Sequence, residues 1–205
     1  MVLPRQSRTN QTRRLALCAA LSALIVVCTM VGYAYTRLPQ KSTAENLEGK
    51  PLDPFAASAN RVVALLFVRT DCPISNRYAP LLQKMSEKFR GRADFWLVYP
   101  DRGETASQIK AHLQAYHYSI AAVRDTDHAL VRRAQATITP EAAVFDSSGR
   151  LLYHGRIDNW YEDFGRSRPA ATSHELDDAI SSAIAGKPIH PDHANAVGCY
   201  ISDLT

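Results

Sequence analysis

The sequence predicts an α/β domain with a mixed central sheet and helices on both faces, and three observations indicate this class. Residues 62–68 form an unbroken apolar run rich in β-branched and aromatic residues, which is typical of a strand buried on both faces. Strand-like and helix-like segments then alternate along the chain. A hairpin pattern and a closing amphipathic helix complete the element order of a layered α/β fold.

Cys72 stands where the first strand ends and a helix begins. Apolar side chains recur at spacings of three and four over residues 74–90, and Pro73 suits the first helical turn. The positive end of a helix dipole stabilises an anion, so it lowers the pKa of a thiol placed there. Cys72 is therefore the candidate nucleophile, and an inert buried cysteine is the alternative. Arg69 and Arg77 are expected to lower its pKa further.

A second apolar strand and an amphipathic helix follow. The strand spans residues 94–99, and the helix is expected over residues 104–116, where Ile109, Leu113 and Tyr116 share one face. Alternation of this kind is typical of a sheet whose neighbouring strands run parallel, because a helix connects them.

The second half of the domain adds a short strand, a hairpin and two helices. Residues 120–123 form the strand, and Asp127 suits the N-cap of the helix that follows. Glu141–Phe145 and Leu151–Gly155 are joined by Asp-Ser-Ser-Gly, a turn composition that favours an antiparallel hairpin. The last helix is expected to begin at its cap, Ser173.

The N-terminal part differs from the rest of the chain. Residues 15–35 carry no charged side chain and are about long enough to cross a bilayer, and the arginines of residues 1–14 precede them. We expect a single transmembrane anchor, with the main domain outside the cytoplasm by the positive-inside rule. A cleaved signal peptide is the alternative, in which case the protein is secreted. Residues 36–60 are interpreted as a tether or an edge-wrapping segment.

The excess positive charge also belongs to the N-terminal part. The net charge is +4, but residues 1–37 hold five arginines and no acidic residue. The remainder holds 19 basic and 20 acidic residues. The main domain therefore lacks the basic patterning of nucleic-acid-binding proteins, and we expect no nucleic-acid partner.

Two of the four cysteines, Cys72 and Cys199, lie outside the apolar N-terminal stretch. Two cysteines are too few for a scaffold held together by disulfides, so a chemical use is expected. Cys199 belongs to residues 187–205, a tail without periodicity. If the tail folds back over the start of the helix, the two cysteines form a redox couple or a clamp. Otherwise Cys72 acts on external partners alone.

Residues 61–186 resemble the thioredoxin superfamily. The resemblance rests on a buried strand that runs into Cys72-Pro73-Ile74-Ser75, on Thr139-Pro140, and on the hairpin that follows. It implies a thioredoxin-like fold and a cis peptide bond at Thr139-Pro140 that lies against the active cysteine. Together with Gly155-Arg156-Ile157-Asp158 and Gly198-Cys199, the first motif is also similar to a bacterial redoxin-domain family.

The resemblance implies thiol–disulfide oxidoreductase activity with one departure from the family pattern. Thioredoxins carry Cys-x-x-Cys, but Ser75 takes the fourth position here and cannot close a disulfide. Cys72 is then expected to attack, Thr139 and Pro140 to present the substrate backbone, and Cys199 to resolve the intermediate. The expected partners are cysteine-containing exported proteins or small thiols, and no cofactor is expected.

A thiol peroxidase is one alternative on the same fold. Peroxiredoxins place a Thr or Ser three residues before the reactive cysteine, whereas Thr70 stands two residues before Cys72. They also use an arginine to polarise the peroxide. Arg124 or Arg156 would have to supply that cation.

A copper-handling or redox-inactive binding module is the other alternative. Thiolates and imidazoles suit Cu(I) or Zn, and the tail carries His190 and His193 in addition to Cys199. Two histidines in a proline-containing loop are more often solvated residues. The sequence therefore favours the enzyme, and no metal site is assigned.

Overall fold

The computed structural model describes residues 44–58, 61–202 and 204. The expected transmembrane segment, residues 15–35, and the arm before it lie outside the described residues. Within the described part of the chain, no helix is long and apolar enough to span a bilayer. The membrane anchor therefore stays a prediction.

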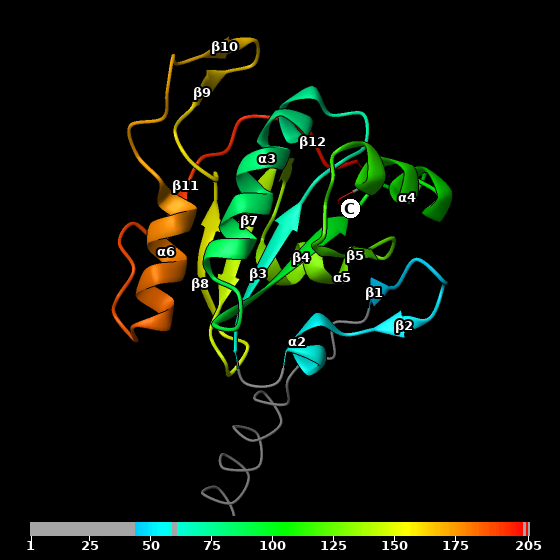
Figure 1. Ribbon diagram of the computed structural model, residues 1–205, viewed down its shortest axis with the longest axis horizontal. Coiled ribbons are helices and arrows are strands. Elements are labelled where there is room, and N and C mark those ends of the chain that lie inside the picture. Colours follow the sequence, from blue (N-terminus) through cyan, green and yellow to red (C-terminus); the bar gives the residue numbers. More distant parts are fainter. Residues whose placement is uncertain (1–43, 59–60, 203, 205) are drawn as a thin grey trace, which may run out of the picture. The chain divides into compact units, whose positions relative to one another are not determined.

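An eight-stranded mixed sheet forms the centre of the domain, in the order β11-β8-β7-β3-β4-β5-β1-β2 (Figure 1). The three inner strands β3, β4 and β5 run parallel, and β7 runs antiparallel to both β3 and β8. The expected sheet of mixed direction is confirmed. Its main strands are β3 (Val62–Phe67), β4 (Ala93–Tyr99), β5 (Ala121–Arg124), β7 (Glu141–Phe145) and β8 (Leu151–Gly155).

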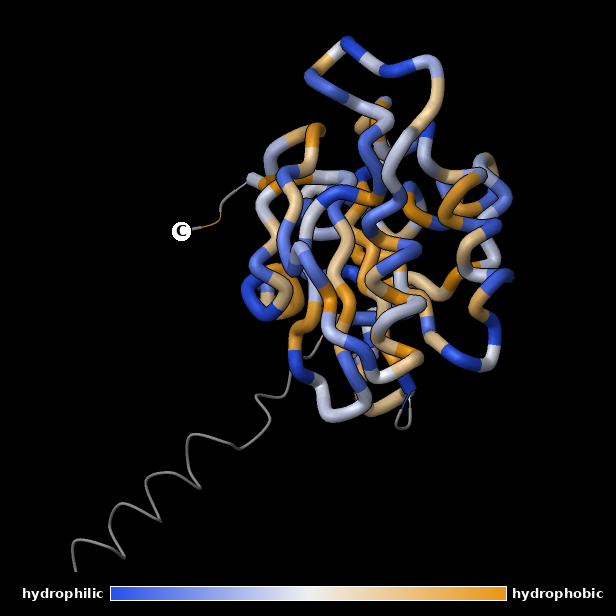
Figure 2. The backbone as a smooth tube through the Cα atoms, turned by 90° about the vertical axis from the view of Figure 1, so that its left-hand side faces the viewer, coloured by the Kyte–Doolittle hydropathy of each residue, from blue (hydrophilic) through white to orange (hydrophobic). Residues whose placement is uncertain are grey.

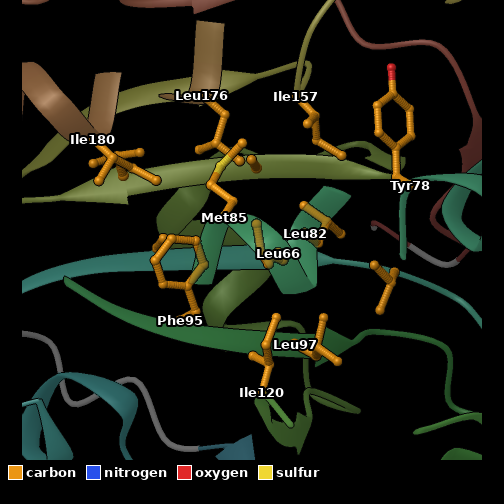
Figure 3. Close-up of a cluster of buried hydrophobic side chains, with 14 of the residues drawn as sticks. Leu66, Tyr78, Leu82, Met85, Phe95, Leu97, Ile120, Ile157, Leu176 and Ile180 are labelled. Carbon is orange, nitrogen blue, oxygen red and sulfur yellow. The ribbon is translucent and has the colours of Figure 1, made fainter. Parts of the chain in front are cut away.

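Helices cover both faces of the sheet, as expected. Every residue of β3 is buried, and its alternate side chains enter two separate apolar clusters. Leu66 packs with Leu82 and Leu176 on one face (Figure 3), whereas Phe67 packs with Leu130 on the other. The helices are α2 (Pro54–Ala57), α3 (Pro73–Lys88), α4 (Ala106–Ala115), α5 (Ala129–Ala134) and α6 (Glu175–Ile184).

Hydropathy follows this layering. Hydrophobic segments gather in the middle of the domain, and hydrophilic segments surround them (Figure 2). The first cluster is built mainly from α3, α6 and the inner strands, and the second from α5 and the opposite strand faces. Burial of these two clusters is the main favourable contribution to folding.

Two segments without periodicity extend the sheet at its edges. β1 (Ala44–Glu45) and β2 (Pro51–Leu52) follow β5 at one edge. At the other edge, β11 (His193–Ala194) pairs parallel with β8. Four further short strands form two small ladders: β6 (Ile138–Thr139) with β12 (Cys199–Tyr200), and β9 (Tyr161–Asp163) with β10 (Arg166–Ser167).

Helix α4 packs Ile109 and Leu113 against the core, as expected, but the predicted face is only partly confirmed. Ile109 is buried, but the second buried side chain is His112, whereas Tyr116 is 36% exposed. The two ring nitrogens of His112 lie 2.8 Å from the hydroxyl of Tyr99 and 2.8 Å from Oδ1 of Asn76. A polar ring is stable there because both nitrogens are hydrogen-bonded. The prediction for Tyr116 was wrong.

The expected caps of two helices were also wrong. α5 begins after His128 rather than Asp127, and Oδ2 of Asp125 accepts a hydrogen bond from a backbone amide of that helix at 2.8 Å. α6 begins after His174, and the hydroxyl of Ser173 donates to a carboxylate in the first turn instead of capping it. In both cases the N-cap residue lies one position after the predicted one.

Candidate active site

Cys72 is the N-cap residue of α3. Its backbone is extended, with φ −82° and ψ 111°, and Pro73 opens the helix. The carbonyl of Cys72 accepts the amide hydrogen of Asn76 at 3.0 Å, which starts the helical hydrogen bonding. The cysteine is 0% exposed, and its thiol donates to the carbonyl oxygen of Thr139 at 3.2 Å. The sulfur therefore lies at the positive end of α3, as expected.

A buried polar network fixes the loop that leads into Cys72. The amide of Thr70 donates to Oε1 of Glu104 at 2.6 Å, and the side chain of Asn76 donates to the carbonyl of Thr70 at 3.1 Å. His112 in turn holds Asn76. Sequence reasoning missed this network. The available signal was a polar residue, His112, three positions after Ile109 on an apolar helix face.

The opposite wall of the site is the Thr139-Pro140 loop. The peptide bond between these residues is cis, as the resemblance implied. Thr139 belongs to β6 and is fully buried, and β12 pairs with it in antiparallel register, with Cys199 opposite Thr139. The hydroxyl of Thr139 donates to the carbonyl of Cys199 at 3.3 Å. The tail thus folds back onto the helix start.

This pairing places the two cysteines in contact. Both are free thiols, and Cys199 Sγ donates to Cys72 Sγ across 3.0 Å. Cys72 is buried, whereas Cys199 is half-buried. The structure therefore brings together all four residues singled out from the sequence: Cys72, Thr139, Pro140 and Cys199.

A family model described as thioredoxin-like matches residues 60–151. The chain contains a thioredoxin-like domain. The match includes β3, Cys72, the whole of α3 and the Thr139-Pro140 loop, so it covers both walls of the site but not the tail. No curated protein matches the chain.

Three solved structures resemble the thioredoxin-like domain. A hypothetical protein from Sinorhizobium meliloti 1021 has 20% identity and a TM-score of 0.64, and the match covers 78% of this chain and 88% of that one. An uncharacterized conserved protein from Geobacillus kaustophilus has 16% identity and a TM-score of 0.65, and the match covers 78% of this chain and 86% of that one. The exposed lipoprotein thioredoxin of Streptococcus pneumoniae strain TIGR4 has 16% identity and a TM-score of 0.51, and the match covers 70% of this chain and 97% of that one. At these identities the likeness shows the fold.

The two thiols of the thioredoxin-like domain differ in acidity. Burial raises the pKa of Cys72, but hydrogen bonds from Cys199 and Ser75 outweigh it, so the net pKa lies below the ordinary 9.0. Burial, the hydrogen bond to Cys72 and the charge of the Cys72 thiolate raise the pKa of Cys199 to about 12, and Arg69 opposes this rise. Cys72 therefore loses its proton first.

Ser75 assists Cys72 from the position where thioredoxins carry a second cysteine. It lies one turn into α3 and is 1% exposed. Its hydroxyl is buried without an oxygen or nitrogen partner, so it is free to donate to the Cys72 sulfur once that sulfur is charged. The departure from the family motif thus removes a sulfur and leaves a hydrogen-bond donor.

The two arginines expected to lower the pKa of Cys72 act elsewhere. Arg69 contacts Asp71 and Asp101, each at 3.1 Å, and its charge acts on Cys199. Arg77 lies over the ring of Trp160, 5.6 Å from the centroid. Burial, which raises the pKa of Cys72, and the hydrogen bonds from Cys199 and Ser75, which lower it, act on this thiol in place of arginine charge.

Residues of the two alternative functions are also engaged elsewhere. Arg124 pairs with Glu45 at 3.5 Å, and Arg156 forms an ion pair with Glu175. His193 packs on another histidine at the edge of the sheet, with ring centroids 4.4 Å apart. Within the described residues, no three His, Cys, Asp or Glu side chains are grouped to hold a metal ion.

Removing the sulfur of Cys199 is expected to raise the pKa of Cys72. In the Cys199→Ala variant the thiolate loses a hydrogen-bond donor, so its pKa moves up toward 9.0. The thiolate fraction, and with it the alkylation rate near neutral pH, then falls. An ultraviolet titration of the thiolate measures the shift. The Cys199→Ser variant keeps a donor and is expected to shift less; an unchanged midpoint in Cys199→Ala contradicts the assignment.

Proposed function

We propose that the thioredoxin-like domain is a thiol–disulfide oxidoreductase in which Cys72 is the nucleophile and Cys199 the resolving cysteine. One observation carries this proposal. The two thiols lie 3.0 Å apart, with a pKa lowered at Cys72 and raised at Cys199. Because the pKa values differ in this way, Cys72 is the sulfur that attacks as a thiolate, and Cys199 stays protonated until the mixed disulfide has formed.

The proposed reaction proceeds by two displacements. The Cys72 thiolate attacks one sulfur of a substrate disulfide, a mixed disulfide forms, and the other substrate sulfur leaves as a thiolate that takes up a proton. Cys199 then loses its proton and attacks Cys72 Sγ, which releases the second substrate sulfur. The substrate gains two electrons, and the protein is left with a Cys72–Cys199 disulfide. The relative reduction potentials decide the direction of this exchange.

The helix and the Thr139-Pro140 loop have separate parts in this reaction. The first turn of α3 and Ser75 stabilise the charge on the attacking sulfur. The carbonyl of Thr139 holds the Cys72 thiol in the reduced state, and its hydroxyl holds the backbone of Cys199. Thr139 thereby fixes the position of the second sulfur.

We further propose that the domain works outside the cytoplasm, attached to the membrane by residues 15–35. The apolar segment and the arginines before it support this location. The similar pneumococcal structure is that of an exposed lipoprotein. The proposed substrates are accordingly cysteine-containing exported proteins or small thiols, since disulfides persist in that compartment.

The direct test is the redox equilibrium of the full-chain protein with glutathione. The protein is incubated at a series of ratios of reduced to oxidised glutathione. Its free thiols are then alkylated, and mass spectrometry of the protein and its peptides identifies the modified cysteines. We expect one transition, in which Cys72 and Cys199 lose both thiols together and reversibly. Separate glutathione adducts on the two cysteines, without an internal disulfide at any ratio, contradict the proposal.

A further inference from the structure

The tail is held against the domain at two glycines where the backbones come unusually close. A Cβ atom on Gly198 would lie 2.0 Å from the carbonyl oxygen of Thr139 and 2.7 Å from its carbonyl carbon. A Cβ atom on Gly155, where φ is +136°, would lie 2.0 Å from the carbonyl oxygen of Ala194. Real Cβ contacts are never this short, and the obstacles are backbone atoms, so a larger residue displaces the tail.

Cys199 and Tyr200 form the strand β12, with Gly198 at a bend before it and Ile201 after it, and each of these four residues has a distinct environment. The backbone of Gly198 lies close to the carbonyl of Thr139, and the sulfur of Cys199 contacts the sulfur of Cys72. Tyr200 is 77% exposed. Ile201 is buried in the second apolar cluster, and its amide donates to the carbonyl of residue 137 at 3.0 Å.

This groove therefore selects by steric exclusion before the cysteine and by apolar burial after it. The first bound residue must be glycine because backbone atoms leave no room for a Cβ, and the second is the cysteine that meets Cys72. The third side chain faces solvent, and the fourth is apolar and buried. Strand pairing with β6 supplies backbone hydrogen bonds that do not depend on sequence, as in other cases of strand addition. The described contacts thus define a binding motif, Gly-Cys-x-apolar.

We propose that the groove between β6 and the start of α3 binds substrate strands of the form Gly-Cys-x-apolar, in place of the tail residues 198–201. This inference rests on the proposed function and names the substrate class of the same site. A substrate cysteine in this register lies where Cys199 Sγ lies now, at reacting distance from Cys72. Cys72 then attacks that sulfur, and the group disulfide-bonded to it leaves as a thiolate.

The tail is suited to be displaced. β12 has only two residues and pairs with a two-residue strand, β6. Two features of its fit to the groove depend on the side chains beside Cys199: the close approach at Gly198 and the burial of Ile201. A substrate strand that offers the same two features competes with the tail directly, and one without them competes poorly.

The experiment compares two peptides on the full-chain Cys199→Ser variant, in which an adduct on Cys72 is not resolved. The first peptide is acetyl-Val-Gly-Cys-Tyr-Ile-amide, the sequence of residues 197–201, with its cysteine disulfide-bonded to 2-nitro-5-thiobenzoate. The second has alanine in place of glycine. Release of the coloured thiolate gives the rate, and intact mass gives the adduct. We expect the alanine peptide to react at least about tenfold more slowly, because an overpacked contact weakens its binding.

Glycine variants of the protein provide the matched comparison. In the same background, Gly198→Ala is expected to loosen the tail and to raise the rate with the glycine peptide. Gly91→Ala, which strains its own turn at φ +77° but has no atom within 4 Å of the added Cβ, is expected to leave that rate unchanged. Reaction of both peptides with free glutathione corrects for any difference in their intrinsic reactivity.

The outcomes separate the two proposals. Equal rates for the glycine and alanine peptides, together with rapid reaction of Cys72 with a small chromogenic disulfide, overturn the Gly-Cys-x-apolar inference and leave the proposed function standing. If neither the peptides nor the small disulfide forms an adduct on Cys72, the oxidoreductase function fails, and the inference fails with it. A slower alanine peptide and a faster Gly198→Ala variant support both.

Discussion

Replacing Cys72 with serine is expected to abolish thiol–disulfide exchange, with a loss of more than about a thousandfold in the rate of substrate reduction. The hydroxyl of serine is not ionised near neutral pH and does not form a disulfide, so the first displacement has no nucleophile. The fold should persist, because serine fits the space of cysteine at the N-cap of α3 and is a preferred residue there. The measurement is the turnover of a protein disulfide under excess reductant, with a thermal melt to check folding.

The Cys199→Ser variant is the matched control for this result. It keeps Cys72 and the first displacement but lacks the resolving sulfur. The expected product is a mixed disulfide between Cys72 and the substrate, visible by intact mass, at one adduct per protein. Residual turnover in Cys72→Ser that equals the wild-type rate shows that the reaction does not pass through Cys72.

Replacing Glu141 with alanine is expected to destabilise the domain by about 3 kcal/mol, because two backbone amides lose their acceptor. Oε2 of Glu141 accepts from the amides of Thr137 at 2.9 Å and Ile138 at 3.1 Å, and the side chain is only 4% exposed. These bonds hold β6, the strand that pairs with the tail. The free energy of unfolding in urea measures the loss.

Glutamine at position 141 tests the cause. Glu141→Gln keeps one oxygen in place to accept from the amides, so its cost should be less than half that of alanine. The alanine variant is also expected to reduce the fraction of Cys72–Cys199 disulfide formed in a fixed glutathione mixture, because β6 no longer holds β12 in register. Equal losses of stability in both variants contradict an acceptor role for Glu141.

The strand–cysteine–helix unit was predictable because its determinants are local. The run that forms β3 is apolar at every position, and the structure buries each of its side chains. Cys72 lies between the end of this run and the start of the helix, whose apolar side chains recur every three or four residues. The hairpin β7–β8 was predicted with the bounds that the structure has, because its turn composition marks both ends.

The tail and the polar network depend on partners distant in the chain, which periodicity does not report. β12 has two residues, too few to show an alternation, and only its pairing with β6 makes it a strand. His112 is buried because Tyr99 and Asn76, from a strand and another helix, bond its ring. Gly198 was noted as part of a motif, but its close approach to Thr139 appears only in three dimensions.

The separation of the two cysteines along the chain gives their pairing an order in time. Cys72 and Cys199 are 127 residues apart. At the usual rates of protein synthesis, the ribosome adds Cys199 about 6 to 25 s after Cys72. During that interval the strand that carries the second thiol does not yet exist. Each new molecule therefore passes through a stage in which Cys72 is present without Cys199, and Cys72 can pair with its resolving partner only after the tail has been made.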